Sequence, residues 1–217
     1  MNIAQIATTR KTTKAFDPSR SIAPELIEQL RTLLQYAPSS VNAQPWHYVI
    51  ASSVAGKERI ANTLKGSYSY NAAKVRTASH VLVFCARRDL DETHLASLLA
   101  QESADGRFKT PEAEAGQHSG RSFYVGLHRE QLKDLDVWVD RQVYLSLGSL
   151  LLGAAALGVD ACPMEGIDCV ALDAELGLAE KGLRSVVMVA LGYRGADDFN
   201  AGLPKSRLPQ KSILTEI

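Results

Sequence analysis

Three short segments of the chain are each rich in basic, hydroxyl or amide side chains. Long stretches of sequence separate one segment from the next. The segments are Arg10 to Lys14, Asn71 to Lys74, and Lys205 to Arg207. By itself, each segment is typical of a solvated surface. Together, their guanidinium and hydroxyl groups can bind a phosphate, and their ammonium groups can stabilise a developing anion.

Two further segments are candidates for ligand-binding loops. Pro38 to Pro45 contains two prolines, two serines and two amides, so it can be neither a helix nor a regular strand. Pro163 to Gly166 encloses Met-Glu between a proline and a glycine, which predicts a sharp, positioned turn. Either segment could also be an ordinary connection between two elements.

Familiar catalytic patterns are absent from the sequence. There is no glycine-rich dinucleotide or phosphate-loop motif, no Gly-x-Ser-x-Gly and no His-Glu-x-x-His. The five histidines are scattered and there is no Cys-x-x-Cys, so no metal site is expected. If the protein is an enzyme, a bound cofactor is therefore expected to carry its reaction.

The elements that would position these segments are mainly helices. Hydrophobic periodicity and capping residues predict helices over residues 2–9, 23–37, 53–64, 89–101, 122–134, 136–158 and 168–177. Aromatic, β-branched and continuous apolar runs predict strands over residues 46–51, 79–86 and 183–193, and a short strand between residues 158 and 168. The polar stretch over residues 102–120 predicts a mobile excursion or lid. Few strands and long helices indicate an α+β fold with a small sheet.

The helix predicted over residues 136–158 is unusual because no charged residue occurs from Gln142 to Val159. Its leucines point in all directions, and a helix that is apolar all round is expected to be buried on all sides. Gly158 is a suitable C-terminal cap. Serines and glycines interrupt the apolar run, which favours a buried helix over a membrane span.

Length and composition set broad limits on the protein. A chain of 217 residues is long enough for a substantial core and is expected to form one domain over residues 1–217. With 24 basic and 24 acidic residues, the net charge is zero and does not favour nucleic acid or a membrane surface. Three cysteines in apolar contexts and an N-terminus without a signal-peptide core lead us to expect a cytoplasmic protein.

Several motifs occur in a fixed order along the whole chain. They are Arg10-x-Thr12-x-Lys14-Ala-Phe, Tyr36-Ala-Pro-Ser-Ser-x-Asn42-x-Gln44-Pro-Trp-His, Asp105-Gly-Arg-Phe, Gln142-Val-Tyr-Leu, Pro163-Met-Glu-Gly166 and Leu203-Pro-Lys-Ser-Arg-Leu-Pro209. In these motifs the sequence resembles the FMN-dependent nitroreductase family, most closely the bacterial oxygen-insensitive NAD(P)H nitroreductases of the minor (type B) group and their flavin reductase relatives. The resemblance implies a nitroreductase-like α+β fold with a small mixed sheet surrounded by helices. It also implies an interlocked homodimer with two FMN sites at the interface.

The resemblance assigns cofactor roles to particular residues. The phosphate of a tightly bound, non-covalent FMN would be held by Arg10, Thr12, Lys205 and Arg207, with Lys11 as a further cofactor contact. The polar edge of the ring would be contacted by Lys14, Asn71 and Lys74. One face of the ring would be lined by Pro163, Met164, Glu165 and Gly166. The other subunit would contribute Pro38, Ser39, Ser40, Asn42 and Gln142.

The resemblance also implies a substrate site for the dinucleotide and the acceptor. Its expected residues are Lys14, Val41, Thr63, Leu64, Lys65, Gly66, Ser67, Tyr70, Lys74, Arg107 and Tyr124. Lys11 and Val41 stand where relatives often have His and Thr, and Tyr70 and Tyr124 stand where relatives often have Phe. Because these positions can change the acceptor preference, the sequence leaves the physiological acceptor open. No side chain is expected to act as a catalytic acid or base.

The implied activity is a ping-pong reaction. NAD(P)H would transfer a hydride to N5 of FMN and leave, and a nitroaromatic compound or a quinone would then receive two electrons together. A nitro group would be reduced to the hydroxylamine. An NAD(P)H flavin reductase or a dihydropteridine reductase of the same fold is an alternative that the sequence does not separate. A non-catalytic flavin-binding protein is a third alternative, which the open cationic face disfavours.

Overall fold

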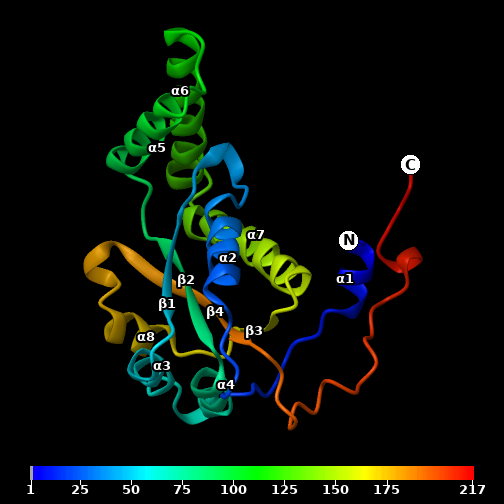
Figure 1. Cartoon of the computed structure of the whole chain (residues 1–217). Helices are drawn as coiled ribbons and strands as arrows, with labels where there is room; N and C mark the ends of the chain where they lie inside the picture. The colour runs from blue at the N-terminus through cyan, green and yellow to red at the C-terminus, as the bar shows by residue number, and fades with distance from the viewer. Residues whose placement is uncertain (1) are drawn as a thin grey trace.

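A four-stranded sheet with helices on both faces forms the centre of the computed structural model, which describes residues 2–217 (Figure 1). Its strands, in the order β1-β2-β4-β3, are β1 (Trp46–Ala51), β2 (His80–Arg87), β4 (Leu183–Gly192) and β3 (Asp160–Met164). The three longer predicted strands are confirmed to within one residue at each end, and β3 is the predicted short strand. The prediction of one domain over residues 1–217 includes Met1, which lies outside the described residues, and it stays a prediction.

All pairings between the four strands are antiparallel. The prediction of a mixed sheet is therefore wrong for these strands, because a run of apolar residues does not encode the direction of its neighbour. The only parallel pairing among the described residues is an isolated bridge between Thr12 and Ala161, beside β3. Pro163 is part of β3, where it is tolerated because β3 is an edge strand.

The helices agree with the predicted order, with one addition and one changed boundary. They are α1 (Ile3–Thr9), α2 (Pro24–Gln35), α3 (Val54–Ala61), α4 (Ala72–Thr77), α5 (Glu92–Ala104), α6 (Pro111–Gly126), α7 (Leu135–Ala156) and α8 (Cys169–Leu176). The short helix α4 was not predicted. The helix predicted over residues 122–134 corresponds to the end of α6, which begins earlier than predicted, and to the π-helical turn Leu127–Gln131 that follows it. Within residues 2–217, no helix is both long and apolar enough to cross a membrane.

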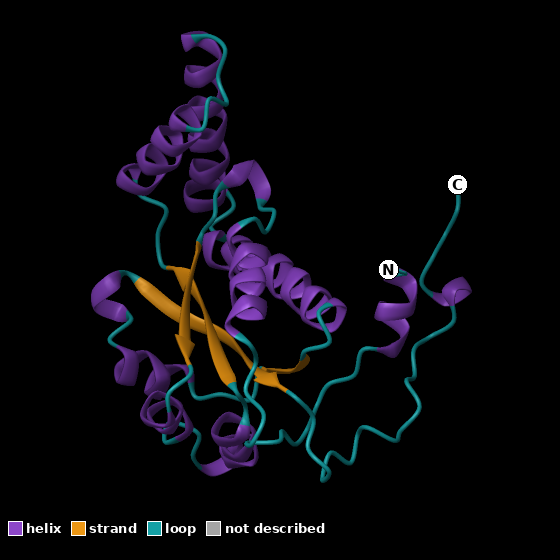
Figure 2. Cartoon of the chain, in the orientation of Figure 1, coloured by secondary structure: helices purple, strands orange, loops and turns teal. Residues whose placement is uncertain are grey.

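Different helices cover the two faces of the sheet (Figure 2). Side chains of a strand point alternately to opposite faces, and β2 follows this rule closely. Leu82 and Phe84 pack in one core with α2 and α7, whereas Val81 and Val83 pack in a second core with α3, α4 and α8. The continuous apolar run of β2 therefore reflects a strand that is buried on both faces.

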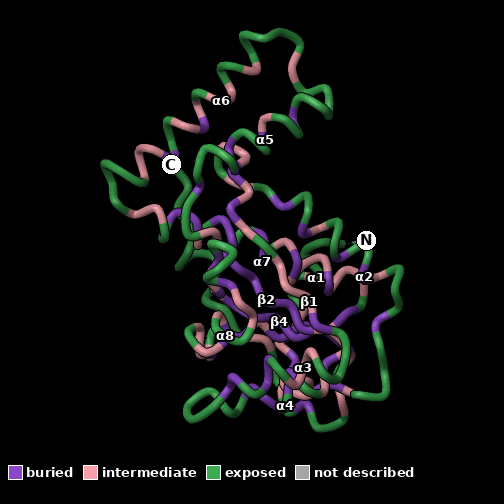
Figure 3. The backbone as a smooth tube through the Cα atoms, turned by 90° about the vertical axis from the view of Figure 1, so that its left-hand side faces the viewer, coloured by how far each residue is buried: buried purple, intermediate pink, exposed green. Residues whose placement is uncertain are grey.

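Residues 102–120 form the end of α5, a short connection and the first part of α6, so this polar stretch is mainly helical, and its role as a mobile excursion or lid stays a prediction. The Thr110 side chain accepts a hydrogen bond from the Ala113 N–H at 3.3 Å, and Pro111 is the first helical residue. Both are helix-start signals that the sequence contains. Gly116 and the polar composition obscured them. The α5–α6 hairpin extends away from the sheet and is largely exposed (Figure 3).

Helix α7 is buried on the side that faces the sheet and α2, where Val143 and Leu150 are fully buried. Its opposite side is exposed in the single chain: Leu145 is 50% exposed and Tyr144 is 40% exposed. The prediction of a helix buried on all sides is therefore wrong for the single chain. Helix α7 has apolar side chains on every side, and the chain's own core covers only one side of it.

The chain after β4 lies away from the sheet and approaches α1 (Figure 1). It includes a 3-10 turn, Gln210–Ser212, and otherwise forms neither helix nor strand over residues 194–217. Large apolar side chains are exposed along it: Phe199, Leu203, Leu208, Ile213 and Leu214. The part of the chain that the structure describes does not cover these apolar side chains.

Replacement of Leu150 by Ala tests the packing of α7 on the sheet. Because Leu150 is fully buried, Leu150→Ala should lower the free energy of unfolding by about 2–5 kcal/mol, measured by urea denaturation. Val170 on α8 is 82% exposed, so the matched change Val170→Ala should stay within about 0.5 kcal/mol of the parent. Equal effects of the two changes would contradict the described position of α7.

Candidate functional site

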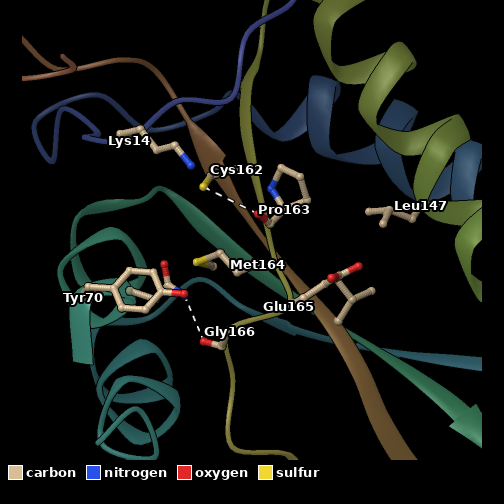
Figure 4. A pocket seen from close by; sticks show the side chains of 10 residues that line it. Lys14, Tyr70, Leu147, Cys162, Pro163, Met164, Glu165 and Gly166 are labelled. Carbon is tan, nitrogen blue, oxygen red and sulfur yellow. Dashed lines mark hydrogen bonds between the residues drawn. The ribbon is translucent and has the colours of Figure 1, made fainter. Parts of the chain in front are cut away.

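A cavity of about 420 Å³ opens beside the end of β3, and we call it the central cavity (Figure 4). Its lining residues are Lys14, Tyr70, Asn71, Leu147, Cys162, Pro163, Met164, Glu165, Gly166 and Val187. Seven of these were predicted from the sequence as cofactor or substrate contacts. The structure adds Leu147, Cys162 and Val187, which sequence reasoning missed because each lies inside an apolar run that reads as core.

The turn after β3 forms one wall of the central cavity. Pro163 and Met164 are the last residues of β3 rather than part of a loop, so the predicted turn is confined to the residues that follow Met164. Gly166 leaves space for its neighbours, since a Cβ atom there would lie 2.2 Å from the Tyr70 hydroxyl oxygen. Asn71 Nδ2 donates a hydrogen bond to Gly166 O at 2.9 Å and fixes the backbone at this point.

Lys74 supports the opposite wall of the central cavity. Its Nζ atom donates to Asn71 Oδ1 and to Tyr70 O, both at 2.9 Å, and lies 5.0 Å from the centre of the Tyr70 ring. Burial lowers the pKa of Lys74, and the charge of Lys14 acts in the same direction. A poorly hydrated cation in this position interacts strongly with any negative charge that develops in the cavity.

The backbone that carries Lys14 is fixed from two sides. Thr13 N–H donates to Ala161 O at 3.1 Å, next to β3. On the other side, Lys14 N–H donates to the buried carboxylate of Asp198 at 3.0 Å, and Asn200 Nδ2 donates to Thr12 O at 2.8 Å. Asp198 and Asn200 were not predicted, because a search for cations and hydroxyls passes over an Asp-Phe-Asn segment in a polar tail.

A second cavity, of about 250 Å³, lies between the two ends of the chain, and we call it the cationic cavity. Its lining residues are Arg10, Lys11, Thr12, Asn200, Leu203, Pro204, Lys205, Ser206 and Arg207. Four of them are cations and none is a carboxylate. The structure thus brings together the predicted phosphate-binding residues, which are about 190 positions apart in the sequence.

Two lysines of the cationic cavity join the chain ends through backbone carbonyls. Lys205 Nζ donates to Arg10 O at 2.8 Å and also to Ala7 O. Lys11 Nζ donates to Leu203 O at 2.7 Å and also to Ala201 O. These bonds hold like charges together although the charges repel one another.

Arg10 contains the least satisfied donor of the cationic cavity. Its Nη1 atom is buried and has no hydrogen-bond partner among the described residues. Burial, followed by the charge of Arg207, lowers the pKa of Arg10. Burial and the charges of Arg10 and Arg207 likewise lower the pKa of Lys205. A buried donor without a partner and a surplus of positive charge both favour an anionic ligand.

The loop over residues 38–45 contains three non-glycine residues with left-handed backbone: Val41 with φ 47°, Asn42 with φ 53° and Gln44 with φ 41°. Ser40 N–H donates to Gln142 Oε1 at 2.8 Å. The loop borders a third cavity, of about 770 Å³, whose lining residues include Pro38, Asn42, Gln44, Glu102 and Arg107. Backbone strain of this kind is typical of functional sites.

Within one chain, the loop residues do not reach the central cavity. The lining of the central cavity contains none of Pro38, Ser39, Ser40, Asn42 and Gln142. Arg107 and Tyr124 lie on the exposed α5–α6 hairpin, and Val41 lies in the loop itself. The residues that were expected from the other subunit therefore lie outside the central cavity of their own chain.

The remaining predicted substrate residues are divided between surface and core. Lys65, Gly66 and Ser67 are exposed in the turn that leads to Tyr70. Thr63 and Leu64 are buried: the Thr63 hydroxyl donates to Ile60 O at 2.8 Å, and Leu64 packs in the second core. Both residues therefore lie behind the turn rather than in the central cavity.

Tyr144 contacts Glu165 in the lining of the central cavity, and the sequence did not single it out. Its hydroxyl donates to Glu165 Oε1 at 2.5 Å. Burial, followed by Glu165, raises the pKa of Tyr144 to about 12. Tyr144 lies two residues after Gln142, inside one of the recurring motifs, and this position was the available signal. Over residues 2–217, no group of three or more His, Cys, Asp or Glu side chains is placed to hold a metal ion.

Sequence comparisons agree with this arrangement. The model of the nitroreductase family matches residues 7–193. The chain is 51% identical to the oxygen-insensitive NAD(P)H nitroreductase of Salmonella typhimurium and 50% identical to that of Enterobacter cloacae, over 100% of each chain. It is also 31% identical to the major NAD(P)H-flavin oxidoreductase of Aliivibrio fischeri, over 95% of this chain and 94% of that relative.

Solved structures show the same fold. A candidate nitroreductase from Exiguobacterium sibiricum, solved in complex with FMN, has a TM-score of 0.83 at 21% identity and covers 100% of this chain and 98% of its own. A nitroreductase-like protein from Streptococcus mutans has a TM-score of 0.81 at 23% identity, covering 99% of this chain and 97% of its own. The predicted nitroreductase-like α+β fold is confirmed, and the chain belongs to the nitroreductase family.

Proposed function

We propose that the protein is an FMN-dependent oxidoreductase that transfers two electrons from NAD(P)H to nitroaromatic compounds and quinones. The observation that carries this proposal is the cationic cavity, where the buried Arg10 Nη1 has no partner among residues 2–217 and the lining contains no carboxylate. A cavity of this kind suits a phosphate monoester. Two full-length relatives at about half identity are NAD(P)H nitroreductases, which supports the electron donor and the acceptor.

The residues present fit the cofactor. Arg10, Lys205 and Arg207 would hold the phosphate, because they form a cationic wall of the cavity. Met164 and Gly166 would lie against the ring, since this turn lines the central cavity and Gly166 has no side chain to obstruct it. Lys14 lines the central cavity, and Thr12, two residues earlier, lines the cationic cavity, so one extended segment serves both.

The chain's own groups would act mainly through charge and position. FMN, when bound, would supply the hydride-accepting and electron-delivering chemistry. Lys14 and Lys74 would stabilise negative charge at the polar edge of the ring, and Asn71 would hold Lys74 and Gly166 in register. Protons for the acceptor would come from solvent, because the central cavity is open to it.

We also propose that the active form is a homodimer of single-domain chains. The exposed Leu145 and Tyr144 on α7 and the apolar tail provide the surface that a second copy would cover. In this arrangement the partner's loop of residues 38–42 and its Gln142 would complete each flavin site. A dimer would also cover the apolar surface of α7 that a single chain leaves exposed.

Reduction of free flavin is a second candidate activity, because the Aliivibrio fischeri relative is a flavin oxidoreductase. A flavin reductase would use the same cofactor, FMN, and so would a dihydropteridine reductase. A non-catalytic flavin carrier is the third candidate, and the cations at the central cavity disfavour it.

Anaerobic reduction tests the proposed function directly. Purified protein loaded with FMN should lose its yellow colour rapidly when NADH or NADPH is added, and a nitrofuran or a quinone should restore the colour. Steady-state turnover of a nitrofuran, a quinone and free FMN, each with both dinucleotides, then ranks the candidate activities. A protein that takes up no FMN, or whose bound FMN is not reduced, would overturn the proposal.

Removal of one cation tests the phosphate site. Arg207→Ala should weaken FMN binding by about 1.5–3 kcal/mol, or roughly ten- to a hundred-fold in dissociation constant, because a charge-assisted hydrogen bond is lost. Titration of the apoprotein by flavin fluorescence measures the constant. Lys211 lies in the same tail but does not line the cavity, so Lys211→Ala should bind FMN like the parent. Equal affinity of the two variants would exclude the phosphate role of Arg207.

Sedimentation velocity tests the dimer. The parent should sediment with twice the mass of one chain, and Leu145→Glu should shift the equilibrium to monomer and release FMN, because a charge would be buried at the interface. Val170→Glu, at an exposed position on α8, should remain a dimer with FMN. A monomeric parent that retains FMN would contradict a shared site.

A further inference from the structure

The loop over residues 39–44 is held in a conformation that its residues do not favour. Val41, Asn42 and Gln44 all have positive φ, and none of them is glycine. For the β-branched Val41, with φ 47° and ψ 24°, this backbone is a clear outlier. Such a conformation persists only where the surrounding structure imposes it. The source of that constraint lies outside the loop.

A buried ion pair supplies the constraint. Arg121 on α6 is completely buried, and Glu102 on α5 is 5% exposed. One guanidinium nitrogen of Arg121 donates to both carboxylate oxygens of Glu102, at 2.7 and 2.6 Å. Both side chains also bond the loop, so the ion pair joins the loop to α5 and α6. These two helices extend away from the sheet (Figure 1).

The same two side chains bind both of the adjacent strained residues. Arg121 Nε donates to Val41 O at 3.0 Å, and Asn42 Nδ2 donates to Glu102 Oε1 at 2.7 Å. Val41 is therefore held through its backbone and Asn42 through its side chain. Arg107 approaches Glu102 only to 4.0 Å and is mostly exposed, so it does not replace Arg121 as the partner of this carboxylate.

Stability by itself does not account for this ion pair. Burial of two charges has a large desolvation cost, and apolar residues of similar volume often give equal or greater stability. What apolar residues cannot provide is a rigid planar donor that bonds a carboxylate and a backbone carbonyl at once. The planar guanidinium therefore fits a geometric role better than a purely stabilising one.

We propose that Glu102 and Arg121 are positioning residues, which hold Val41 and Asn42 in the left-handed conformation and thereby shape the loop before the cofactor binds. This inference rests on the proposed function, in which the loop completes the partner's flavin site. Other side chains fix the rest of the loop: His94 Nε2 donates to Ala43 O at 2.8 Å, and Gln142 accepts from Ser40 N–H. The ion pair is the part that acts on the strained residues themselves.

A charge-balanced double variant tests the proposal without leaving a buried charge unpaired. Glu102→Leu/Arg121→Met should melt within about 5 °C of the parent or higher, because the desolvation cost is removed. Its dissociation constant for FMN, titrated by flavin fluorescence on the apoprotein, should rise about tenfold or more, because the loop must then be ordered during binding. Addition of Val41→Gly should recover part of that loss, since glycine adopts positive φ without strain.

The matched control replaces a surface ion pair of the same composition. Arg59 on α3 pairs with Glu175 on α8 at 2.6 Å, with both side chains partly exposed. Arg59→Met/Glu175→Leu should bind FMN like the parent. Parental FMN affinity in a folded Glu102→Leu/Arg121→Met variant would identify the pair as structural and overturn the proposal.

Arg121→Lys decides the matter if the double variant does not fold. It keeps the charge but loses the forked donors, so the same titration should again show about tenfold weaker FMN binding. Parental affinity in Arg121→Lys, or failure of both variants to fold, would overturn the proposal. A parent protein that binds no FMN would be a failure of the proposed function instead, and it is recognised before any variant is made.

Discussion

The uncharged surface of α7 is the constraint on which the rest of the structure depends. Burial of each large apolar side chain contributes roughly 1.5–3 kcal/mol, and residues such as Val143 and Leu150 lie in the core between the helix and the sheet. This packing fixes the helix relative to β2 and β4. It also places Gln142, Tyr144 and Leu147 on successive faces, where they contact the strained loop, the turn after β3 and the central cavity.

The cationic cavity keeps positively charged side chains close together, and a bound anion would reduce their repulsion. Four positive side chains converge there without a carboxylate, and in isolation they would drive the chain ends apart. Hydrogen bonds from Lys11 and Lys205 to backbone carbonyls hold the ends together instead. Asn200 adds a neutral bond to Thr12. A bound anion would then relieve the remaining repulsion, so we expect ligand binding to stabilise the folded state appreciably.

Strain and buried charge occur together at the loop over residues 39–44. Neither feature favours folding by itself, since left-handed non-glycine residues cost roughly 1–3 kcal/mol each and buried ion pairs are seldom net stabilising. Their combination is informative because the ion pair bonds the strained residues directly. Local rules of propensity and burial are broken at this point, as expected where a site, rather than the core, has determined the residues.

The sequence by itself determined most of the elements and the kind of chemistry expected at the site. Alternation and apolar runs were sufficient for three strands, and the positions of Arg10, Lys14 and Lys205 indicated a cofactor with a phosphate. Helix α6 was also readable from Thr110 and Pro111, although its polar residues concealed it. These features are local, because caps and periodicity act over a few residues.

Only the tertiary structure decided the strand directions, the exposed side of α7, and the partners Glu102, Arg121, Asp198 and Tyr144. In the sequence, a charged residue of a polar helix that will be buried cannot be distinguished from one that will be exposed to solvent. Glu102 and Arg121 are 19 residues apart on different helices, and Asp198 is 184 residues from the backbone that it binds. Their roles depend on burial and on long-range approach, which follow from packing of the whole chain and not from any local pattern.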